Sequence, residues 1–215
     1  MRDYRTDICP ADSNRIGYVI LPMPPSFEDL EWMRRSAEKH KTNLVLLSGM
    51  DWNNDMTPWP APSVFSCERN FEGRADTFLQ VLLKDVIPSV ESVLQRNNME
   101  RSLIGLSLSG LFSLWASCHT DAFSSIASIS GSLWYDGFIE WLMWHVPYIA
   151  YAYLLLGDRE KNTRNPRMAV VEEKTEIACR ILQEKGVDTF YELESGTHFS
   201  PYLPRLEKAF NHLFV

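Results

Sequence analysis

Along almost the whole chain, short apolar runs rich in strand-forming residues alternate with longer segments of helical periodicity. We expect strands over residues 16–21, 43–48, 102–106, 125–130, 148–156 and 188–194. Helices are expected over about 26–39, 74–95, 108–118, 167–183 and 201–213, with a kink at Pro88. Such alternation is typical of a mainly parallel sheet whose crossover helices cover both faces. The sequence therefore predicts the α/β class, as a three-layer α/β/α sandwich of about six strands.

Composition places the chain among ordinary globular proteins. Of its 215 residues, 45% are hydrophobic and 23% are charged, which argues against extensive disorder. No internal repeat or break in composition marks a second domain, so residues 1–215 are interpreted as a single domain. The formal net charge of -7 gives no support to nucleic-acid binding, which needs a basic face.

The first ten residues lack the apolar core of a signal peptide. The nearest approach to a membrane span, residues 138–156, is interrupted by Glu140, His145 and Pro147. The cysteines are scattered without metal-type pairing and are interpreted as free thiols: Cys9, Cys67, Cys118 and Cys179. We therefore expect a cytoplasmic protein with no membrane partner and no bound metal.

The sharpest chemical signal is the segment GLSLSG at residues 105–110, between an expected buried strand and an expected helix. A nucleophile elbow places its serine on a tight strand-to-helix turn of this kind. The turn needs small residues two places before and after the serine, because neighbouring backbone packs closely there. Gly105 meets the first requirement, whereas Ser109 replaces the second glycine. Ser107 is the predicted nucleophile; the alternative is a helix start capped by that serine.

A serine hydroxyl needs a base to take its proton. His198 lies in SGTHFS (195–200), in the loop between the last expected strand and the last expected helix. That position completes the chain order serine, acid, histidine. His145 is less clear, since the aromatic segment around it could border the site. The remaining histidines are interpreted as surface or capping residues: His40, His119 and His212.

The acid that orients the imidazole is expected in GDRE (157–160), directly after the fifth expected strand. Glu160 is favoured for its spacing from Gly157 and its longer reach. Asp158 is the alternative, because it is closer to the strand end.

Acyl transfer also needs hydrogen-bond donors for the oxyanion. The backbone N–H of Leu108, at the start of the nucleophile helix, is one expected donor. The second is expected at the end of the first strand, where Pro22 has no N–H and Met23 is the better candidate.

The loop at residues 51–60 follows a parallel strand, so it should lie on the catalytic side of the sheet. Its tryptophans Trp52 and Trp59 could form an aromatic wall, and Asp51 or Asp55 could bind a polar group. A proline-stiffened loop whose tryptophans cover the core is the equal alternative. Expected substrate-binding residues are Trp52, Asp55, Trp59 and Trp134.

An aromatic segment, residues 131–147, is a candidate small cap. Helical spacing of Phe138, Trp141 and Trp144 favours core packing over a cap role. If the segment is a cap, the pocket beneath it is bulky and apolar.

The chain resembles the esterase family of the α/β-hydrolases that includes esterase D-like, feruloyl and siderophore esterases. The resemblance covers roughly residue 16 to the C-terminus. It rests on GLSLSGLFSLW (105–115), SLWY (132–135), GDRE (157–160) and GTH (196–198). It implies an α/β-hydrolase fold and cleavage of small-molecule esters through an acyl-enzyme, without a cofactor. The chain is short for this family, and the leading antiparallel strands of the larger sheet are expected to be missing.

Three other functions would use the same residues differently. An acyltransferase or a peptidase would use the same serine–histidine–acid apparatus. A catalytically silent binding protein would keep the fold alone, but the intact order of all three groups argues against it. The oligomeric state and the natural ester are not predicted by the sequence.

Overall fold

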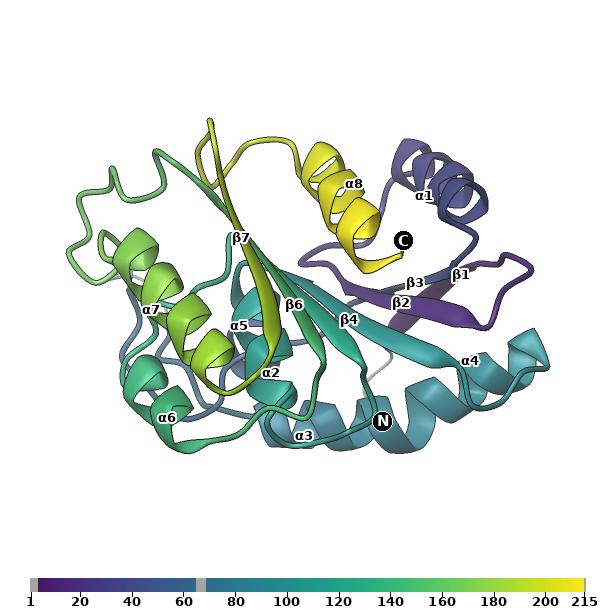
Figure 1. Cartoon of the computed structure of the whole chain (residues 1–215), viewed down its shortest axis with the longest axis horizontal. Helices are drawn as coiled ribbons and strands as arrows, with labels where there is room; N and C mark the ends of the chain where they lie inside the picture. The colour runs from purple at the N-terminus through teal and green to yellow at the C-terminus, as the bar shows by residue number, and fades with distance from the viewer. Residues whose placement is uncertain (1–3, 65–68, 215) are drawn as a thin grey trace.

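The computed structural model describes residues 4–64 and 69–214 (Figure 1). Within these residues a seven-stranded sheet forms in the order β1-β3-β2-β4-β5-β6-β7. The strands are β1 (Arg5–Cys9), β2 (Arg15–Ile20), β3 (Asn43–Ser48), β4 (Glu100–Leu106), β5 (Ser125–Ile129), β6 (Tyr151–Gly157) and β7 (Asp188–Glu194). Strands β2 to β7 pair in parallel, and β1 runs antiparallel to β3. The predicted mainly parallel sheet is confirmed.

Helices cover both faces of this sheet (Figure 1). They are α1 (Phe27–His40), α2 (Trp52–Asp55), α3 (Ala75–Val81), α4 (Ile87–Leu94), α5 (Leu108–Ala116), α6 (Phe138–Trp144), α7 (Val171–Glu184) and α8 (Tyr202–Leu213). Helices α1 and α8 lie on one face, and the others lie on the opposite face. Each face has its own hydrophobic core, so the central strands are buried on both sides and consist of nearly continuous apolar residues. The three-layer arrangement is the predicted one.

Strand β1 was not predicted, and it corrects the expectation that the leading antiparallel part of the sheet is absent. Its sequence RTDIC is half polar, and it lies at the edge of the sheet beside β3. Only Cys9 is buried, while Arg5 and Thr6 are exposed. Edge strands commonly carry charged residues, which weakens the alternation by which a strand is recognised in a sequence.

The helices largely follow their local signals. Ser26 caps α1 through a capping box with Asp29, as helix-start chemistry predicts. The helix expected over 74–95 is instead divided by a π-helical segment, η1 (Leu82–Val86), immediately before α4. Pro88, in the first turn of α4, has no N–H to donate to the preceding turn, and widening that turn accommodates the missing bond.

The chain changes direction across the sheet at β2, which pairs with β3 on one side and with β4 on the other. The connection from β2 to β3 runs through α1 on one face, and the connection from β3 to β4 runs over the other face. In open α/β sheets, ligands bind outside the carboxyl ends of the strands at such a point. Ser107 follows β4 directly and lies at this position.

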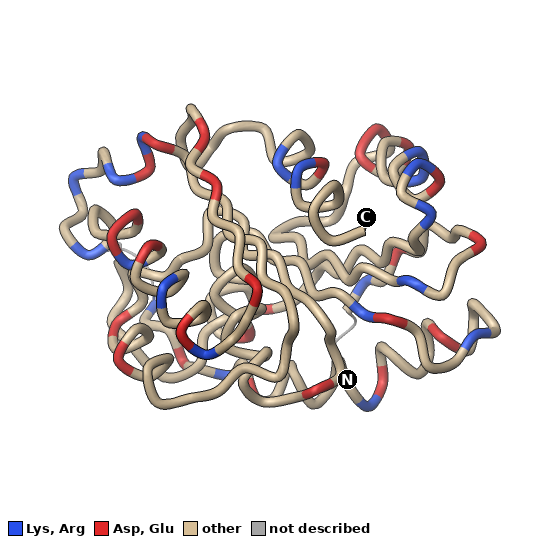
Figure 2. Tube along the Cα trace, in the orientation of Figure 1, with Lys and Arg blue, Asp and Glu red and all other residues tan. Residues whose placement is uncertain are grey.

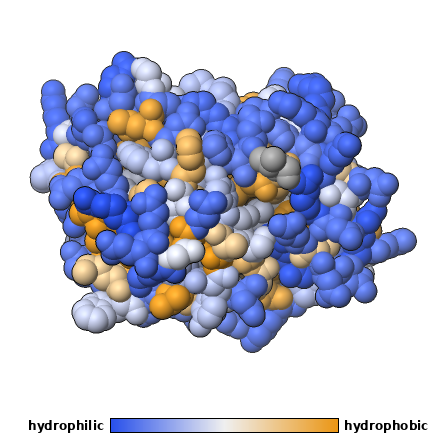
Figure 3. Space-filling view, viewed as in Figure 1, coloured by the Kyte–Doolittle hydropathy of each residue, from blue (hydrophilic) through white to orange (hydrophobic). Residues whose placement is uncertain are grey.

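Charged side chains are concentrated on the helices and loops, and the central strands carry few of them (Figure 2). On the face in Figure 3, hydrophilic residues dominate and apolar residues form scattered patches. Across the described ranges, no helix combines the length and the apolar composition that crossing a bilayer requires.

Candidate active site

Ser107 occupies a strained turn between β4 and α5. Its backbone has φ 57° and ψ -120°, a region that side-chain-bearing residues rarely adopt. A Cβ at Gly105 would lie 1.9 Å from the carbonyl oxygen of Ser109, so a larger residue cannot fit there. The backbone N–H of Ser107 donates to Ile129 at 2.9 Å, which ties the turn to β5. This is the geometry of a nucleophile elbow.

Ser109, which stands where the motif has its second glycine, is fully buried and holds the elbow from inside. Its hydroxyl accepts the Leu106 N–H at 2.8 Å and lies 3.0 Å from the carbonyl oxygen of Ile20, at the end of β2. The departure from the motif therefore adds a tether between the elbow and the neighbouring strand. The second close approach falls on Gly110, where a Cβ would lie 2.9 Å from the Cα of Gly131.

His198 lies in the loop between β7 and α8, and its ring reaches Ser107. Its Nε2 is 3.1 Å from the Ser107 Oγ, and its Nδ1 is 2.8 Å from Glu160 Oε2. An ionised carboxylate can only accept, so Nδ1 carries the proton and donates it to Glu160. In the neutral ring, Nε2 is then the acceptor for the serine hydroxyl.

Of the two candidate acids, Glu160 contacts the histidine and Asp158 does not. The Asp158 carboxylate accepts the backbone N–H of Gly196 at 2.9 Å and is half exposed. It therefore braces the loop that carries His198 through the backbone. The geometry brings together Ser107, His198 and Glu160, three residues from the ends of β4, β7 and β6.

Glu160 is buried, yet three donors hold its second oxygen. Oε1 accepts the Ser130 hydroxyl at 2.7 Å, the Gly157 N–H at 2.9 Å and the Arg205 Nη1 at 3.1 Å. Burial raises the pKa of Glu160, and the hydrogen bonds from His198, Ser130 and Gly157 outweigh it and hold that pKa below the ordinary glutamate value. The carboxylate therefore stays charged and keeps one oxygen for the imidazole.

Several residues at this site were not identified from the sequence. Ser130, after β5, has φ 50° and donates to Glu160. Ser132 donates its N–H to the Ser107 carbonyl at 3.0 Å, and its hydroxyl is 3.4 Å from the Ser107 Oγ. Arg205 lies on α8, seven residues after His198 and outside every motif. Ser132 opens the SLWY segment that carries the family resemblance, but that segment indicated no role for it. Ser130 and Arg205 belong to no motif by which sequence reasoning could find them.

The expected oxyanion donors lie at the ends of neighbouring elements. Leu108 begins α5, and the first N–H groups of a helix have no partner within it. In the connection after β2, the Leu21 N–H donates to Leu47, and Pro22 has no N–H. The next N–H along the chain belongs to Met23, whose side chain is exposed. Their roles stay predictions.

The expected substrate-binding residues divide between framework and surface. Asp55 is 1% exposed, and its carboxylate accepts the Asp51 N–H at 2.9 Å and faces Arg74 at 3.7 Å. The carboxylate therefore bonds the loop's own framework, and a contact between Asp55 and a polar substrate group stays a prediction. Trp52 is half-buried and packs on the core.

Trp59 belongs to an aromatic cluster with the segment that was considered as a cap. Its Nε1 donates to the Asp136 carbonyl at 2.9 Å, and its ring stacks on Phe138 and packs on Trp141. Phe138 is fully buried, whereas Trp144 is exposed. The core-packing interpretation of the helical spacing therefore holds for Phe138 and fails for Trp144.

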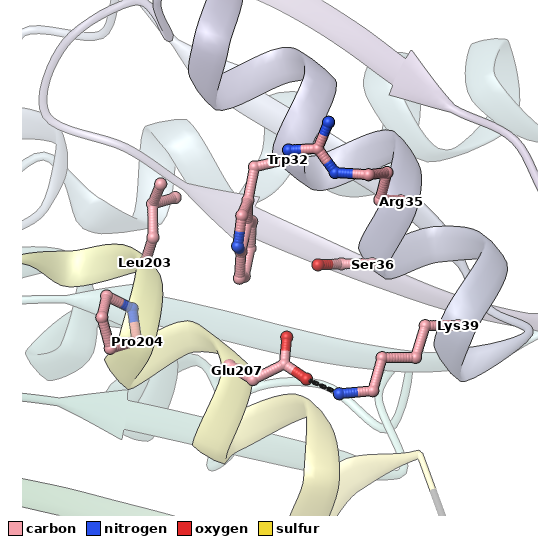
Figure 4. A pocket seen from close by; sticks show the side chains of 7 residues that line it. All are labelled: Trp32, Arg35, Ser36, Lys39, Leu203, Pro204 and Glu207. Carbon is pink, nitrogen blue, oxygen red and sulfur yellow. Dashed lines mark hydrogen bonds and ion pairs between the residues drawn. The ribbon is translucent and has the colours of Figure 1, made fainter.

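Trp134 borders a cavity of about 280 Å³ whose walls include Arg167 and Lys174. The Arg167 guanidinium lies 5.9 Å from the Trp134 ring centre. A separate groove of about 580 Å³ runs between α1 and α8, where Lys39 pairs with Glu207 (Figure 4). None of the three residues of the serine–histidine–glutamate cluster lines it. Among the described residues, no group of three or more His, Cys, Asp or Glu is arranged to hold a metal ion.

A family model described as "Putative esterase" matches residues 24–212, which include Ser107, Glu160 and His198. The chain belongs to this esterase family. One curated relative, the uncharacterized protein YbbA of Bacillus subtilis, is 28% identical over 167 residues. That match spans 73% of this chain and 66% of YbbA, just under two thirds of the relative's length.

Solved structures with the same fold include hydrolases. An IroE-like serine hydrolase from Shewanella oneidensis superposes with a TM-score of 0.78 at 16% identity, over 99% of this chain and 80% of that one. The siderophore hydrolase EstA from Aspergillus nidulans superposes with a TM-score of 0.69 at 22% identity, over 98% of this chain and 89% of that one. At these identities the likeness establishes the α/β-hydrolase fold.

Proposed function

We propose that this member of the esterase family hydrolyses carboxylic esters of small molecules through an acyl-enzyme on Ser107. The observation that supports this most directly is the continuous hydrogen-bond chain from Glu160 Oε2 through His198 to the Ser107 Oγ, with links of 2.8 and 3.1 Å. Nucleophile, base and orienting acid within hydrogen-bond reach are the requirement for covalent catalysis by serine.

Acylation begins when the Ser107 Oγ attacks the ester carbonyl and His198 Nε2 takes the hydroxyl proton. Glu160 stabilises the imidazolium that forms and keeps Nδ1 as the donor. The tetrahedral oxyanion is stabilised by the backbone N–H groups of Leu108 and Met23. The C–O bond to the alcohol then breaks, and His198 returns the proton to the leaving alkoxide.

Deacylation repeats these steps with water. His198 removes a proton from the water as it attacks the acyl carbon, and the second tetrahedral intermediate collapses to release the acid. The proton returns to the Ser107 Oγ, so the enzyme is regenerated with no net change. No step needs a group beyond the three side chains, two backbone donors and water.

The substrate class proposed is an ester of a small molecule. Two proteins of similar structure, EstA and EstB from Aspergillus nidulans, are siderophore hydrolases. A panel of short acyl, feruloyl and siderophore lactone esters, compared by kcat/KM, would rank these classes for this chain.

The proposal is tested by replacing Ser107 with alanine and measuring hydrolysis of a short aryl ester. We expect kcat to fall by at least about 10⁴-fold with the fold intact. The matched control is Ser113→Ala, which removes a buried hydroxyl within α5 that donates to the Ser109 carbonyl. Activity retained by Ser107→Ala, or lost equally in Ser113→Ala, would overturn the assignment.

The same assay separates the rival uses of the site. Added alcohol or amine that captures most of the acyl group in place of water would indicate an acyltransferase. Cleavage of peptides with higher kcat/KM than esters would indicate a peptidase. Folded wild-type protein that neither turns over any ester nor reacts with a fluorophosphonate would indicate a binding protein.

A further inference from the structure

Arg205 is a buried cation on α8, facing the serine–histidine–glutamate cluster. Its exposed fraction is 2%, although arginine is rarely buried unless it is paired. Its neighbour one turn on, Lys208, is partly exposed, as is usual for a cation on the outer part of an amphipathic helix. The burial of Arg205 therefore calls for partners that satisfy its donors.

The guanidinium reaches the ends of three different strands. It donates to the Ser130 hydroxyl after β5 at 2.5 Å, and to Glu160 Oε1 after β6 at 3.1 Å. It also donates to Glu194 at the end of β7 at 2.6 Å. A fourth bond runs to the carbonyl of Thr197, the residue before His198, at 3.1 Å. One planar group thus joins the loop of the acid to the loop of the base.

Two glycines leave the space that this guanidinium fills. A Cβ at Gly157 would lie 2.8 Å from the Arg205 Nη2, and a Cβ at Gly196 would lie 2.9 Å from the same atom. Neither glycine has a positive φ, so backbone conformation does not require them. Both belong to the motifs that carry the acid and the base, GDRE and GTH. A Cβ at Gly157 would also lie 2.7 Å from the Gly196 carbonyl oxygen, and a Cβ at Gly196 would lie 2.8 Å from the Ser200 hydroxyl, so the guanidinium is one of several groups packed against these glycines.

We propose that Arg205 is a positioning residue of the esterase site, which holds the Glu160 loop and the His198 loop in fixed relation. The proposal rests on the proposed function. By occupying Oε1 together with Ser130, the guanidinium leaves Oε2 as the oxygen aimed at the imidazole. By binding the Thr197 carbonyl, it fixes the backbone from which His198 projects. Lysine cannot replace it fully, since one ammonium lacks the planar fork that spans these acceptors.

The charged groups that face this position are the carboxylates of Glu160, after β6, and Glu194, at the end of β7. Glu160 faces both Arg205 and His198. Glu194 bonds both Arg205 and Lys208. Without the guanidinium, Glu160 would act on His198 as an uncompensated carboxylate and would favour the protonated ring.

The experiment compares three single variants of the full chain by steady-state ester hydrolysis from pH 5 to 9. They are Arg205→Met, Arg205→Lys and the control Lys208→Met. In the wild type, Lys208 bonds Glu192 and Glu194 but not Glu160. Each is first shown to be folded by circular dichroism and thermal denaturation. The rate of fluorophosphonate reaction with Ser107 is followed over the same pH range.

Arg205→Met should lower kcat by about 10²-fold, the effect of an ångström-scale misplacement, with KM changed less than about threefold. The acid limb of its kcat/KM profile should move to higher pH by about one unit. Arg205→Lys retains the charge, so its acid limb should stay near the wild-type position while kcat falls severalfold. Lys208→Met should match the wild type in kcat and in the position of the acid limb.

An unchanged kcat and acid limb in folded Arg205→Met would overturn the proposal, as would an equal loss in Lys208→Met. If Arg205→Met does not fold, Arg205→Lys decides: wild-type kcat in that variant contradicts positioning by a guanidinium. A wild-type enzyme without Ser107-dependent hydrolysis would instead refute the proposed function, and that result is seen before any Arg205 variant is made.

Discussion

Replacement of Glu160 with glutamine tests the hydrogen-bond chain at its acid end, because the structure dictates which way the new amide must turn. Glu160 Oε1 faces three donors, from Ser130, Gly157 and Arg205. An amide NH₂ at that position would oppose the Gly157 N–H and the Arg205 guanidinium, neither of which can accept, and only the Ser130 hydroxyl could turn to accept it. At the Oε2 position it would oppose only His198 Nδ1. The glutamine should therefore direct its NH₂ toward His198.

That orientation reverses the role of the imidazole. Nδ1 must accept the amide hydrogen, so the ring proton moves to Nε2, which can no longer take the proton of Ser107. A wrong tautomer with intact geometry lowers kcat by about 10⁴-fold in serine enzymes. That loss corresponds to about 5 kcal/mol of transition-state stabilisation.

The assay is hydrolysis of a short aryl ester at pH 7 to 8, with Asp158→Asn as the matched control. Asp158 contacts the histidine loop only through the Gly196 N–H, so its variant should keep kcat within about tenfold of the wild type. Crystals of the glutamine variant should show unchanged positions for the three side chains. Near-normal activity of Glu160→Gln, with a large loss in Asp158→Asn, would refute the reasoning.

Three further predictions concern the elbow, the core and acid stability. Gly105→Ala should lower unfolding free energy by about 3 kcal/mol and reduce fluorophosphonate labelling, because its Cβ would meet the Ser109 carbonyl; wild-type urea midpoint and labelling would contradict this. Phe138→Ala should cost about 3–5 kcal/mol in urea denaturation, whereas Trp144→Ser should stay within about 0.5 kcal/mol; equal effects would refute the division between core and surface. Folding lowers the pKa of Glu160 from its ordinary value of 4.5, so the ionised carboxylate stabilises the fold above pH 4.5 and this stabilisation is lost as the pH falls further. Glu160→Gln should therefore lose less unfolding free energy than the wild type as the pH falls below 4.5. An identical dependence of unfolding free energy on pH in the two proteins would count against the lowered pKa.

The parts of the fold that could be predicted from the sequence are those with a strong local signal. The buried strand β3 and the edge strand β7, which has no fully buried residue, both begin and end at the predicted residues, because turn residues or a helix C-cap bound their runs. The strand expected from Tyr148 starts instead at Tyr151, since the N–H groups of Tyr148 and Ala150 donate to Ser117 and Ser124 outside the ladder. Apolar composition alone does not reveal that change of partner.

Helix α7 illustrates the same limit. It was expected from Arg167 and begins at Val171, because the residues before it form turns around Asn165. Arg167 itself donates to the Asp136 carboxylate and to the Pro62 carbonyl. Pro62 lies 105 residues away in the sequence. Long-range bonds of this kind override local helical propensity.

The predicted nucleophile, base and acid could be brought together from topology alone, since each follows a parallel strand and the strand ends meet at one edge of the sheet. The residues that hold Glu160 and the His198 loop in place could not be predicted in this way. Ser130 and Arg205 come from separate elements, and only the packed α8 brings the guanidinium to Glu160. Three predicted free thiols are unpaired in the structure, and the fourth, Cys67, lies outside the described residues.

The most direct test of the central claim is identification of the residue that a fluorophosphonate modifies in the folded protein. We expect a single adduct by intact mass, located on Ser107 by peptide mapping, with labelling abolished in Ser107→Ala and retained in Ser113→Ala. An adduct on any other residue, or no adduct on folded wild-type protein, would contradict a serine esterase mechanism at this site.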